Sequence, residues 1–515
     1  MPGSFDIFVT STSTTLVDAP PPVTVVAHRR GERVRALVRR IPPPLALLLG
    51  VAALLSLAWT FTTAPLQGPD EPAHFSYAQY LAETGHRPSV SKGNLPDSTQ
   101  TGTALGFLNL QQLAGDRAAR PAWSHLEERR FDTFIAGLGK KAARDGSGPN
   151  ALAKNPPLYY AYEAIPYRIG SLGSYWDRLI LMRLGSGFLF LLTVLFTWLA
   201  AAEVFGGLWP RVIATGSVAL LPGLTAISGV VNSDNMLIAV WAAFAFAALR
   251  IVNRGPSLGR TVAVCGVAAA SLATHGRGTA IVVPLAVVLA IAFIRARPPL
   301  AATVRWLGAG LGLLAAVLIA YVAFVGSTGG AYGGEIRTGP VALKPLQLIS
   351  WTWQFYFPRL PFMEVRHGPA YGYRQMFIES FFGRFASLEV TYGAPVYTLI
   401  KAVTSLGLLG LVAAVVTRWS AVRVKWPSVA ALLAMTVGML GLLHTASYRA
   451  LLSGVDPLIT GRYLYPLVPV FGCTIAFVLT SVRARVSAVL GGLVLGGLLA
   501  LNLTGLMLTL ARFYG

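Results

Sequence analysis

Two adjacent acidic residues, Asp70 and Glu71, are the side chains of this sequence best placed to do chemistry. They follow the charge-free apolar run 45–61, in a segment 68–72 that reads Gly-Pro-Asp-Glu-Pro. A carboxylate held at a membrane surface can accept the proton of a hydroxyl group and make its oxygen more nucleophilic. Acidic side chains near membrane depth are costly and are commonly functional. The pair therefore predicts a general base where the chain leaves the membrane.

The same two residues also fit the start of a helix. Asp70 suits an N-cap, Pro72 suits the first turn, and Glu71 is favoured there by the helix dipole. The pattern predicts an interfacial helix that runs through Leu81 and is stopped by Gly85. The residues leave both interpretations open, chemistry and capping.

Further polar groups occur where apolar runs end. Residues 154–160 read Lys-Asn-Pro-Pro-Leu-Tyr-Tyr, in which the prolines set an extended entry and then permit a helix to begin. The two tyrosines suit a membrane interface, so an aromatic belt is the alternative to a binding site. Residues 232–235, Asn-Ser-Asp-Asn, open a later apolar run.

Arginines at the membrane boundary favour phosphate or carboxylate partners. Arg277 lies beside His275 in a turn between two short apolar runs, and Arg462 opens another run within Gly-Arg-Tyr. Arg462 could bind a phosphate bidentately while the first helical turn offers N–H groups to the same anion. Snorkelling of the side chains to lipid headgroups is the alternative.

Composition places these residues in a membrane protein. Hydrophobic residues make up 54% of the chain and charged residues only 12%, against about 25% charged in a soluble domain. Apolar runs of roughly 17 to 25 residues cross about 30 Å of hydrocarbon. We predict an all-α polytopic bundle of about eleven transmembrane helices, at 44–62, 179–201, 209–227, 232–250, 261–275, 278–294, 305–326, 395–417, 427–447, 464–482 and 486–511.

Basic residues predict the orientation. Six arginines between 29 and 40 precede the first span, and with a cytoplasmic N-terminus every short inner loop is basic. This count requires two spans between Arg260 and Arg297, because a single kinked helix would place the later basic loops outside. The net charge of +21 is spread over membrane-flanking clusters, which disfavours nucleic acid and favours contact with anionic lipid.

Three segments lie outside the apolar pattern. Residues 1–43 are predicted to be a disordered basic cytoplasmic tail ahead of the membrane domain 44–515, and the regions 63–178 and 327–394 are predicted outer loops carrying interfacial helices. The second loop is dense in aromatic residues, which argues against disorder. Cys265 and Cys473 both fall in predicted spans, so we expect no disulfide framework in the outer loops.

Four ordered motifs together resemble a known family. The Asp70-Glu71-Pro72 pair, the Pro-Pro-Leu-Tyr-Tyr stretch, the segment 379–385 (Glu-Ser-Phe-Phe-Gly-Arg-Phe) and the segment 461–466 (Gly-Arg-Tyr-Leu-Tyr-Pro) are similar to those of the bacterial membrane-protein family called domain of unknown function 2142. That family is usually placed in the GT-C superfamily of lipid-dependent glycosyltransferases, in which the Asp-Glu pair of the first outer loop includes the catalytic base.

The resemblance implies an inverting glycosyltransferase of the plasma membrane that uses a polyprenyl-phosphate sugar and a glycan or glycolipid acceptor at the outer face. No cofactor is firmly implied, and a divalent cation is left open. A transporter or flippase of a lipid-linked glycan and a noncatalytic envelope-assembly scaffold are the alternatives. The roles predicted are catalytic for Asp70 and Glu71; donor phosphate-binding for Arg462, Arg277, Lys154, Arg183 and His275; and substrate-binding for His74, Asn155, Tyr159, Tyr160, Asp234, Asn235, Glu379, Arg384 and Tyr463.

Overall fold

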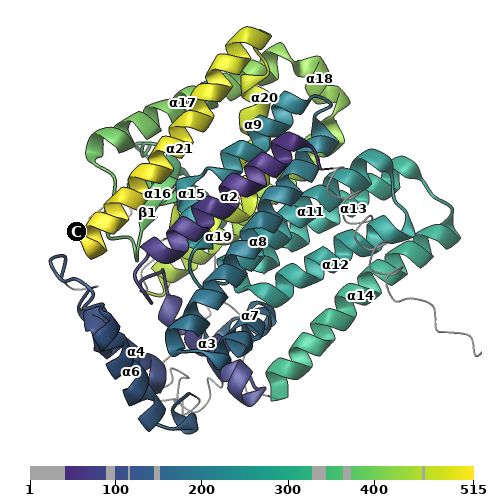
Figure 1. Cartoon of the computed structure of the whole chain (residues 1–515). Coiled ribbons are helices and arrows are strands. Elements are labelled where there is room, and N and C mark those ends of the chain that lie inside the picture. The colour runs from purple at the N-terminus through teal and green to yellow at the C-terminus, as the bar shows by residue number, and fades with distance from the viewer. Residues whose placement is uncertain are drawn as a thin grey trace, which may run out of the picture. The chain divides into compact units, whose positions relative to one another are not determined.

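The computed structural model describes residues 41–88, 99–113, 116–143, 151–327, 344–363, 373–454 and 459–515 (Figure 1). It divides into two units, residues 1–46 and residues 47–515. Most of the predicted tail, 1–40, lies outside the described residues.

Helices form nearly all of the described secondary structure. The first half contains α2 (Pro43–Thr62), α3 (Glu71–Thr84), α4 (Thr99–Gly106), η1 (Phe107–Asn109), α5 (Leu110–Leu113), α6 (His125–Gly137), η2 (Lys140–Ala143), η3 (Ala151–Lys154), α7 (Leu158–Ile169), η4 (Gly170–Leu172), α8 (Tyr175–Val204), α9 (Leu208–Ala219), α10 (Pro222–Ser228) and α11 (Asp234–Arg254). The second half contains α12 (Leu258–Thr274), η5 (Gly276–Ile281), α13 (Val282–Ala296), α14 (Leu300–Ser327), α15 (Pro345–Tyr356), α16 (Tyr373–Gly383), α17 (Ala394–Thr417), α18 (Trp419–Val424), α19 (Trp426–Leu452), η6 (Gly461–Leu467), α20 (Val468–Leu479) and α21 (Ala484–Tyr514). Two short strands, β1 (Arg384–Phe385) and β2 (Val390–Thr391), pair antiparallel with Arg384 opposite Thr391.

Each predicted span corresponds to a helix or to a bent pair of helices. Over the described ranges, nine helices are long and apolar enough to cross a membrane, and α9 with α10 forms a further pair bent by 59°. The shorter apolar helix α12 accounts for the remaining predicted span. Pro222 at the start of α10 explains the bend, because proline lacks the N–H that would continue α9. The predicted class, an all-α multi-pass membrane protein, is confirmed.

The turn at His275 separates two helices, as the distribution of basic residues requires. α12 ends at Thr274, and the 3₁₀ turn η5 leads into α13. The single kinked helix considered as an alternative is therefore wrong.

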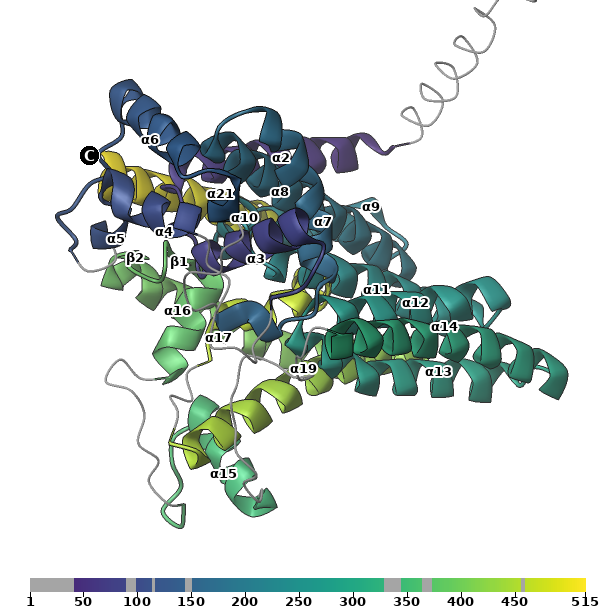
Figure 2. The ribbon, with the colours of Figure 1, turned by 90° about the horizontal axis from the view of Figure 1, so that it is seen from below.

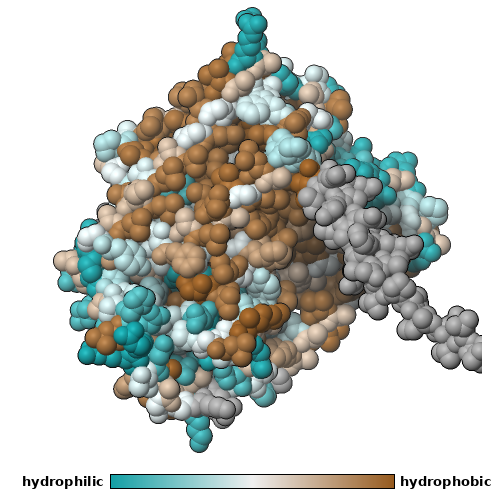
Figure 3. All heavy atoms as spheres, in the orientation of Figure 1, coloured by the Kyte–Doolittle hydropathy of each residue, from teal (hydrophilic) through white to brown (hydrophobic). Residues whose placement is uncertain are grey.

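Apolar packing holds the helices of the larger unit together. α8 packs against α11, α12 against α14, and α20 against α9. Figures 1 and 2 both show α11, α12, α13 and α14 grouped together, and α4 beside α6 at one end. Figure 3 shows a broad hydrophobic surface on the face viewed in Figure 1, with hydrophilic side chains gathered over α4 and α6. This distribution fits a membrane-crossing bundle with a polar region at one end.

Two helices outside the spans, α3 and α7, begin where the sequence predicts. α3 begins at Glu71 and is closed by Gly85, whose positive φ of 71° suits glycine. α7 begins at Leu158, directly after the two prolines. These helices carry the first two motifs to the same end of the bundle, since α3 packs against α7.

Candidate functional site

Glu71 and Arg183 form a buried ion pair behind the first motif. The Arg183 side chain is 1% exposed and that of Glu71 is fully buried, with Nη2 of the arginine 2.7 Å from Oε2 of the acid. The Nε and two Nη atoms of Arg183 also donate to Glu71 Oε1 and to the carbonyl oxygens of Thr60, Thr63 and Ala64. All five guanidinium N–H groups therefore have protein partners.

Glu71 also accepts hydrogen bonds from the backbone. Its two oxygens receive the N–H groups of Gly68, at 3.1 Å, and Val231, at 3.0 Å. Asn232 completes the attachment because its side chain donates to the carbonyl oxygen of Pro69. The pair thus fastens the loop after α2 to α8 and to the turn before α11. Glu71 works as a structural anchor that fixes the backbone next to Asp70.

Asp70 is placed differently from its neighbour. It occupies the N-cap of α3 in the left-handed backbone region (φ 56°), but its side chain makes no capping hydrogen bond. Asp and Asn tolerate this region better than most residues. The side chain is 55% exposed, and its Oδ2 lies 2.9 Å from Nη2 of Arg462. Oδ1 makes no hydrogen bond with any residue that the structure describes. The side-chain hydrogen bond that the capping explanation of Asp70 predicts is therefore not made.

Arg462 is positioned by close packing of η6 against α16. The N–H of Gly461 donates to Oγ of Ser380 at 2.7 Å, and the hydroxyl of Tyr465 donates to the carbonyl oxygen of Phe381. A Cβ atom on Gly461 would lie 2.1 Å from the carbonyl oxygen of Phe377, so only glycine fits there. The first turn is a 3₁₀ helix, and the N–H of Gly461 is already used. The N–H of Gly461 is therefore not among the N–H groups that this turn could offer to an anion.

Arg462 and Arg277 both contact the ring of Tyr463. Their Cζ atoms lie 5.4 Å and 4.2 Å from its centre. Arg277 is also paired with Asp234, and its backbone N–H donates to Nδ1 of His275. The structure therefore brings together six of the predicted site residues: Asp70, Asp234, His275, Arg277, Arg462 and Tyr463.

Both arginines keep buried donors that have no partner. Nε and Nη1 of Arg462, and Nε and Nη1 of Arg277, are buried and make no hydrogen bond with any residue that the structure describes. A buried polar group without a partner costs free energy. Guanidinium groups bind phosphate and carboxylate through paired N–H donors. This arrangement is suited to an anionic ligand.

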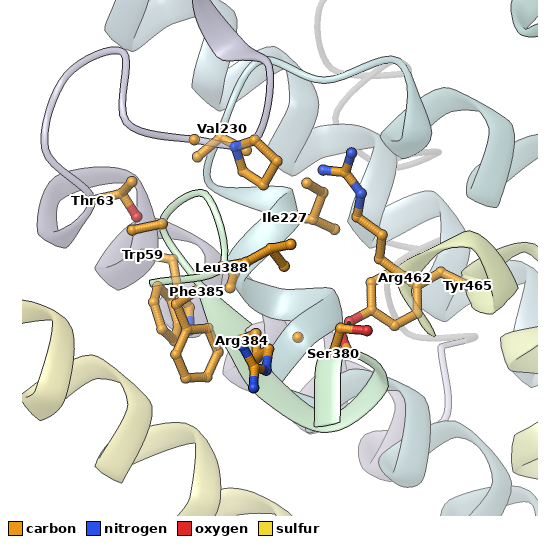
Figure 4. A pocket seen from close by; sticks show the side chains of 15 residues that line it. Trp59, Thr63, Ile227, Val230, Ser380, Arg384, Phe385, Leu388, Arg462 and Tyr465 are labelled. Carbon is orange, nitrogen blue, oxygen red and sulfur yellow. Dashed lines mark hydrogen bonds between the residues drawn. The ribbon is translucent and has the colours of Figure 1, made fainter. Parts of the chain in front are cut away.

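A pocket lies beside this cluster. It is narrow, with a cavity volume of about 30 Å³, well below the usual range of small-molecule sites, about 300–1,000 Å³. Figure 4 shows Trp59 and Phe385 against each other on one side and Arg462 on the other. The remaining walls come from the segments around Pro69, Gly223, Val230 and Leu388. The pocket is thus apolar with cationic groups at its edge.

Arg384 is the second cation that lines the pocket. Its Nε and Nη2 donate to the same carboxylate oxygen, Oε2 of Glu379, at 3.0 Å and 2.6 Å. Gln375 donates to the other oxygen of Glu379. Glu379 is buried, so its function here is to orient Arg384 toward the pocket.

The tyrosine motif forms a separate buried network. Nδ1 of His74 lies 3.1 Å from the hydroxyl of Tyr160, and the side-chain amide of Asn155 donates to the same hydroxyl. The hydroxyl of Tyr159 lies 2.9 Å from Oγ of Ser186. None of His74, Asn155, Tyr159 or Tyr160 lines the pocket. These four residues pack behind the site and support α3.

Two other predicted residues, Arg183 and Asn235, use their side-chain donors in contacts within the protein. Arg183 has no N–H left for a phosphate, so we correct its predicted role to a structural one. The side-chain amide of Asn235 donates to the carbonyl oxygens of Ile227 and Val230, and it stabilises that turn. Lys154 ends η3, and its side chain is outside what the structure describes.

The sequence did not single out several residues that build the site. Ser380 and Tyr465 fix η6 on α16, and Trp59 walls the pocket from within an apolar helix. The first two lie inside motifs that were recognised, but their mutual contact joins positions about 80 residues apart. Within the described ranges no group of three or more His, Cys, Asp or Glu side chains is arranged to hold a metal ion.

Comparison with known proteins identifies the family. The family model described as Predicted membrane protein (DUF2142) matches residues 53–471. The chain belongs to this family. No curated protein matches it in sequence.

Two solved structures of one protein are similar to this chain. The structure of ArnT from Cupriavidus metallidurans in the apo state has a TM-score of 0.48 at 12% identity. The structure of the same protein bound to undecaprenyl phosphate has a TM-score of 0.46 at 13% identity. In both cases the match covers 91% of this chain and 75% of that one.

Proposed function

We propose that this protein is a membrane glycosyltransferase that transfers a sugar from a polyprenyl-phosphate donor to a glycan or glycolipid acceptor at the outer face of the plasma membrane. One observation carries the proposal. A half-exposed carboxylate, Asp70, is paired with an arginine whose remaining donors are buried and unused. A base and an anion-binding group thus lie side by side at the edge of a pocket.

We infer the following transfer reaction from the positions of Asp70 and Arg462. Asp70 accepts the proton of an acceptor hydroxyl through Oδ1 as that oxygen attacks the anomeric carbon of the donor sugar. The bond between this carbon and the phosphate oxygen breaks with inversion, and polyprenyl phosphate leaves. The free donors of Arg462, with Arg277 at the ring of Tyr463, hold the phosphate and stabilise its charge. Such stabilisation in a site of low dielectric is commonly the largest catalytic contribution.

The apolar walls of the pocket suit the part of the donor next to the phosphate, and the pocket, at about 30 Å³, must widen to admit it. Trp59 and Phe385, whose ring centres are 4.7 Å apart, present aromatic surface to the space next to Arg462. Arg384 supplies a second cation near the same space. Aromatic rings pack well against sugar faces and prenyl groups, while the arginines determine where the phosphate lies.

The substitution Asp70→Asn tests the base. It keeps the size of the side chain and can still accept a hydrogen bond from Arg462, so the fold should survive. Transfer should fall by at least about 10²-fold, because an amide cannot take the acceptor proton. Purified protein in lipid is assayed with radiolabelled polyprenyl-phosphate sugars, offered one at a time, and with cell-envelope material as acceptor. Asp116→Asn, which removes an exposed acid that caps a turn, is the matched control.

Glu71→Gln separates the two acids of the pair. Because Glu71 anchors Arg183, its loss should lower the melting temperature and transfer together, whereas Asp70→Asn should lower transfer only. Full transfer by Asp70→Asn would remove the enzyme proposal. A transporter or a scaffold would then be the better explanation.

The proposed orientation predicts which loops are accessible. Ser124 at the start of α6 and Ser420 in α18 are exposed and should lie on opposite sides of the membrane. A cysteine at Ser124 should react with an impermeant thiol reagent in intact cells, and one at Ser420 should react only after lysis. The reverse pattern would place the candidate site inside the cell.

A further inference from the structure

A second cavity lies far from the candidate site, between α8, α11 and α12. It has a volume of about 330 Å³. Arg250 lines this cavity. It is 16 residues beyond Asp234 along α11, a distance of about 24 Å. The hydrocarbon core of a bilayer is about 30 Å thick. The cavity is therefore near the opposite membrane boundary from the pair of Asp70 and Arg462.

The cavity has an apolar part and a cationic end. Phe196, Phe246 and Val267 supply apolar surface, and Ala247 leaves space between them. Arg250 and Arg260 are the charged residues of its lining. This distribution matches a lipid, which joins an acyl chain to a polar headgroup.

Within the described residues, no carboxylate is paired with the charges that line this end of the cavity. Arg254, the next arginine along α11, is paired with Glu203 at 2.9 Å. Arg250 contacts the ring of Phe246 and has no ion pair or hydrogen bond with any described residue. Arg260 donates to Oγ of Ser257 and to the carbonyl oxygen of Arg254, both uncharged acceptors. Two positive charges thus border the apolar cavity without a carboxylate.

We propose that this cavity binds an anionic phospholipid of the leaflet opposite to the candidate site. Its phosphate would lie at Arg250 and Arg260, and one acyl chain would run along Phe196, Phe246 and Val267. A zwitterionic lipid fits less well because it brings an ammonium group to two unpaired arginines. Basic pockets between transmembrane helices are suited to acidic headgroups. The inference does not depend on the proposed enzymatic activity.

The test compares two lipids with the same acyl chains, phosphatidylglycerol and phosphatidylcholine. Each is titrated into the purified full-length protein in detergent, and bound lipid is counted by native mass spectrometry. We expect phosphatidylglycerol to bind more tightly. The double variant Arg250→Gln, Arg260→Gln should lose about thirtyfold in affinity for it, since each basic residue near an anionic lipid contributes about fivefold.

Two further variants make the test specific. The control Arg483→Gln, Arg485→Gln removes the same charge from exposed positions where α21 begins, and it should bind phosphatidylglycerol like the parent. Ala247→Trp fills the cavity but keeps both arginines, and it should lose the tight phosphatidylglycerol complex. Equal binding of the two lipids by the parent, equal affinity of the two double variants, or unchanged affinity in Ala247→Trp would each overturn the proposal.

Discussion

Two buried arginines at the same end of the bundle use their N–H groups in opposite ways. Arg183 donates all of its N–H groups to Glu71 and to three backbone carbonyl oxygens. Arg462 makes one ion pair, with Asp70, and keeps two buried nitrogen atoms without a partner. Both side chains are less than one-fifth exposed, so burial does not distinguish them.

The difference indicates which charge maintains the fold and which one awaits a ligand. A buried ion pair with every donor satisfied is costly to break, because removing one partner leaves the other charge buried and unpaired. A buried arginine with unused donors already bears part of that cost. An anionic ligand that accepts hydrogen bonds from these donors would remove this free-energy cost. We therefore propose that Glu71 and Arg183 belong to the framework, and that Asp70 and Arg462 belong to the candidate site.

The largest effect should come from Arg183→Gln. It leaves the Glu71 carboxylate buried without its counterion, which typically costs about 3–5 kcal/mol. We expect a large drop in the melting temperature of the purified protein, followed by intrinsic fluorescence in detergent. Arg178→Gln, on the same helix but only partly buried, should have a much smaller effect. Similar melting of the two variants would show that full hydrogen bonding does not mark a framework residue.

Arg462→Ala should affect turnover instead of stability. Loss of one group that stabilises the leaving charge typically costs about 10²-fold to 10³-fold in rate. Arg462→Lys should recover only part of this, because the planar fork of donors is lost. Arg277→Ala should have a smaller effect, since Arg277 is engaged by Asp234 and contacts the ring of Tyr463.

The measurements that check this prediction are the transfer rate and the melting temperature of the same preparations. Arg359→Ala, at an exposed position after α15, is the control for loss of an arginine. If Arg462→Ala melts as early as Arg183→Gln, the two arginines do not differ in role and the distinction fails.

Much of the fold was predictable because it depends on local sequence. Run length identified the spans, and Gly85 and the two prolines before Leu158 fixed the limits of α3 and α7. The bend at Pro222 was not predicted, since a single apolar run covers both α9 and α10. Family membership also followed from short motifs.

The division of roles between Asp70 and Glu71 could not be predicted in the same way. The two acids are adjacent, and both suit a helix start. Their partners are 392 and 112 positions away in the sequence, at Arg462 and Arg183. Only the packing of η6 on α16 and of α8 on the loop after α2 decides which acid is exposed. The same long-range contacts turned Arg183 from a predicted ligand into an anchor.

Glu163 is a buried ionisable side chain of a third kind. Its expected effect on stability is smaller than that of Arg183. Its carboxyl group is fully buried in α7, accepts a hydrogen bond from Ser186, and has no cationic partner in the part of the chain that the structure describes. Burial raises the pKa of Glu163 well above its ordinary value. Burial therefore disfavours the ionised form of Glu163, whereas Glu71 has a counterion.

This difference predicts a pH dependence of stability. In an unfolded chain the pKa of Glu is about 4.3, so the contribution of Glu163 is fully present below that pH and is lost as pH rises toward its raised folded pKa. The loss is at most about 1.4 kcal/mol per pH unit. Glu163→Gln is neutral at every pH and should remove this dependence. Melting between pH 5 and pH 8 should fall more for the parent than for the variant, while Glu128→Gln, on the surface helix α6, should follow the parent. Parallel pH profiles for the parent and Glu163→Gln would mean that Glu163 is ionised in the folded protein and has a counterion after all.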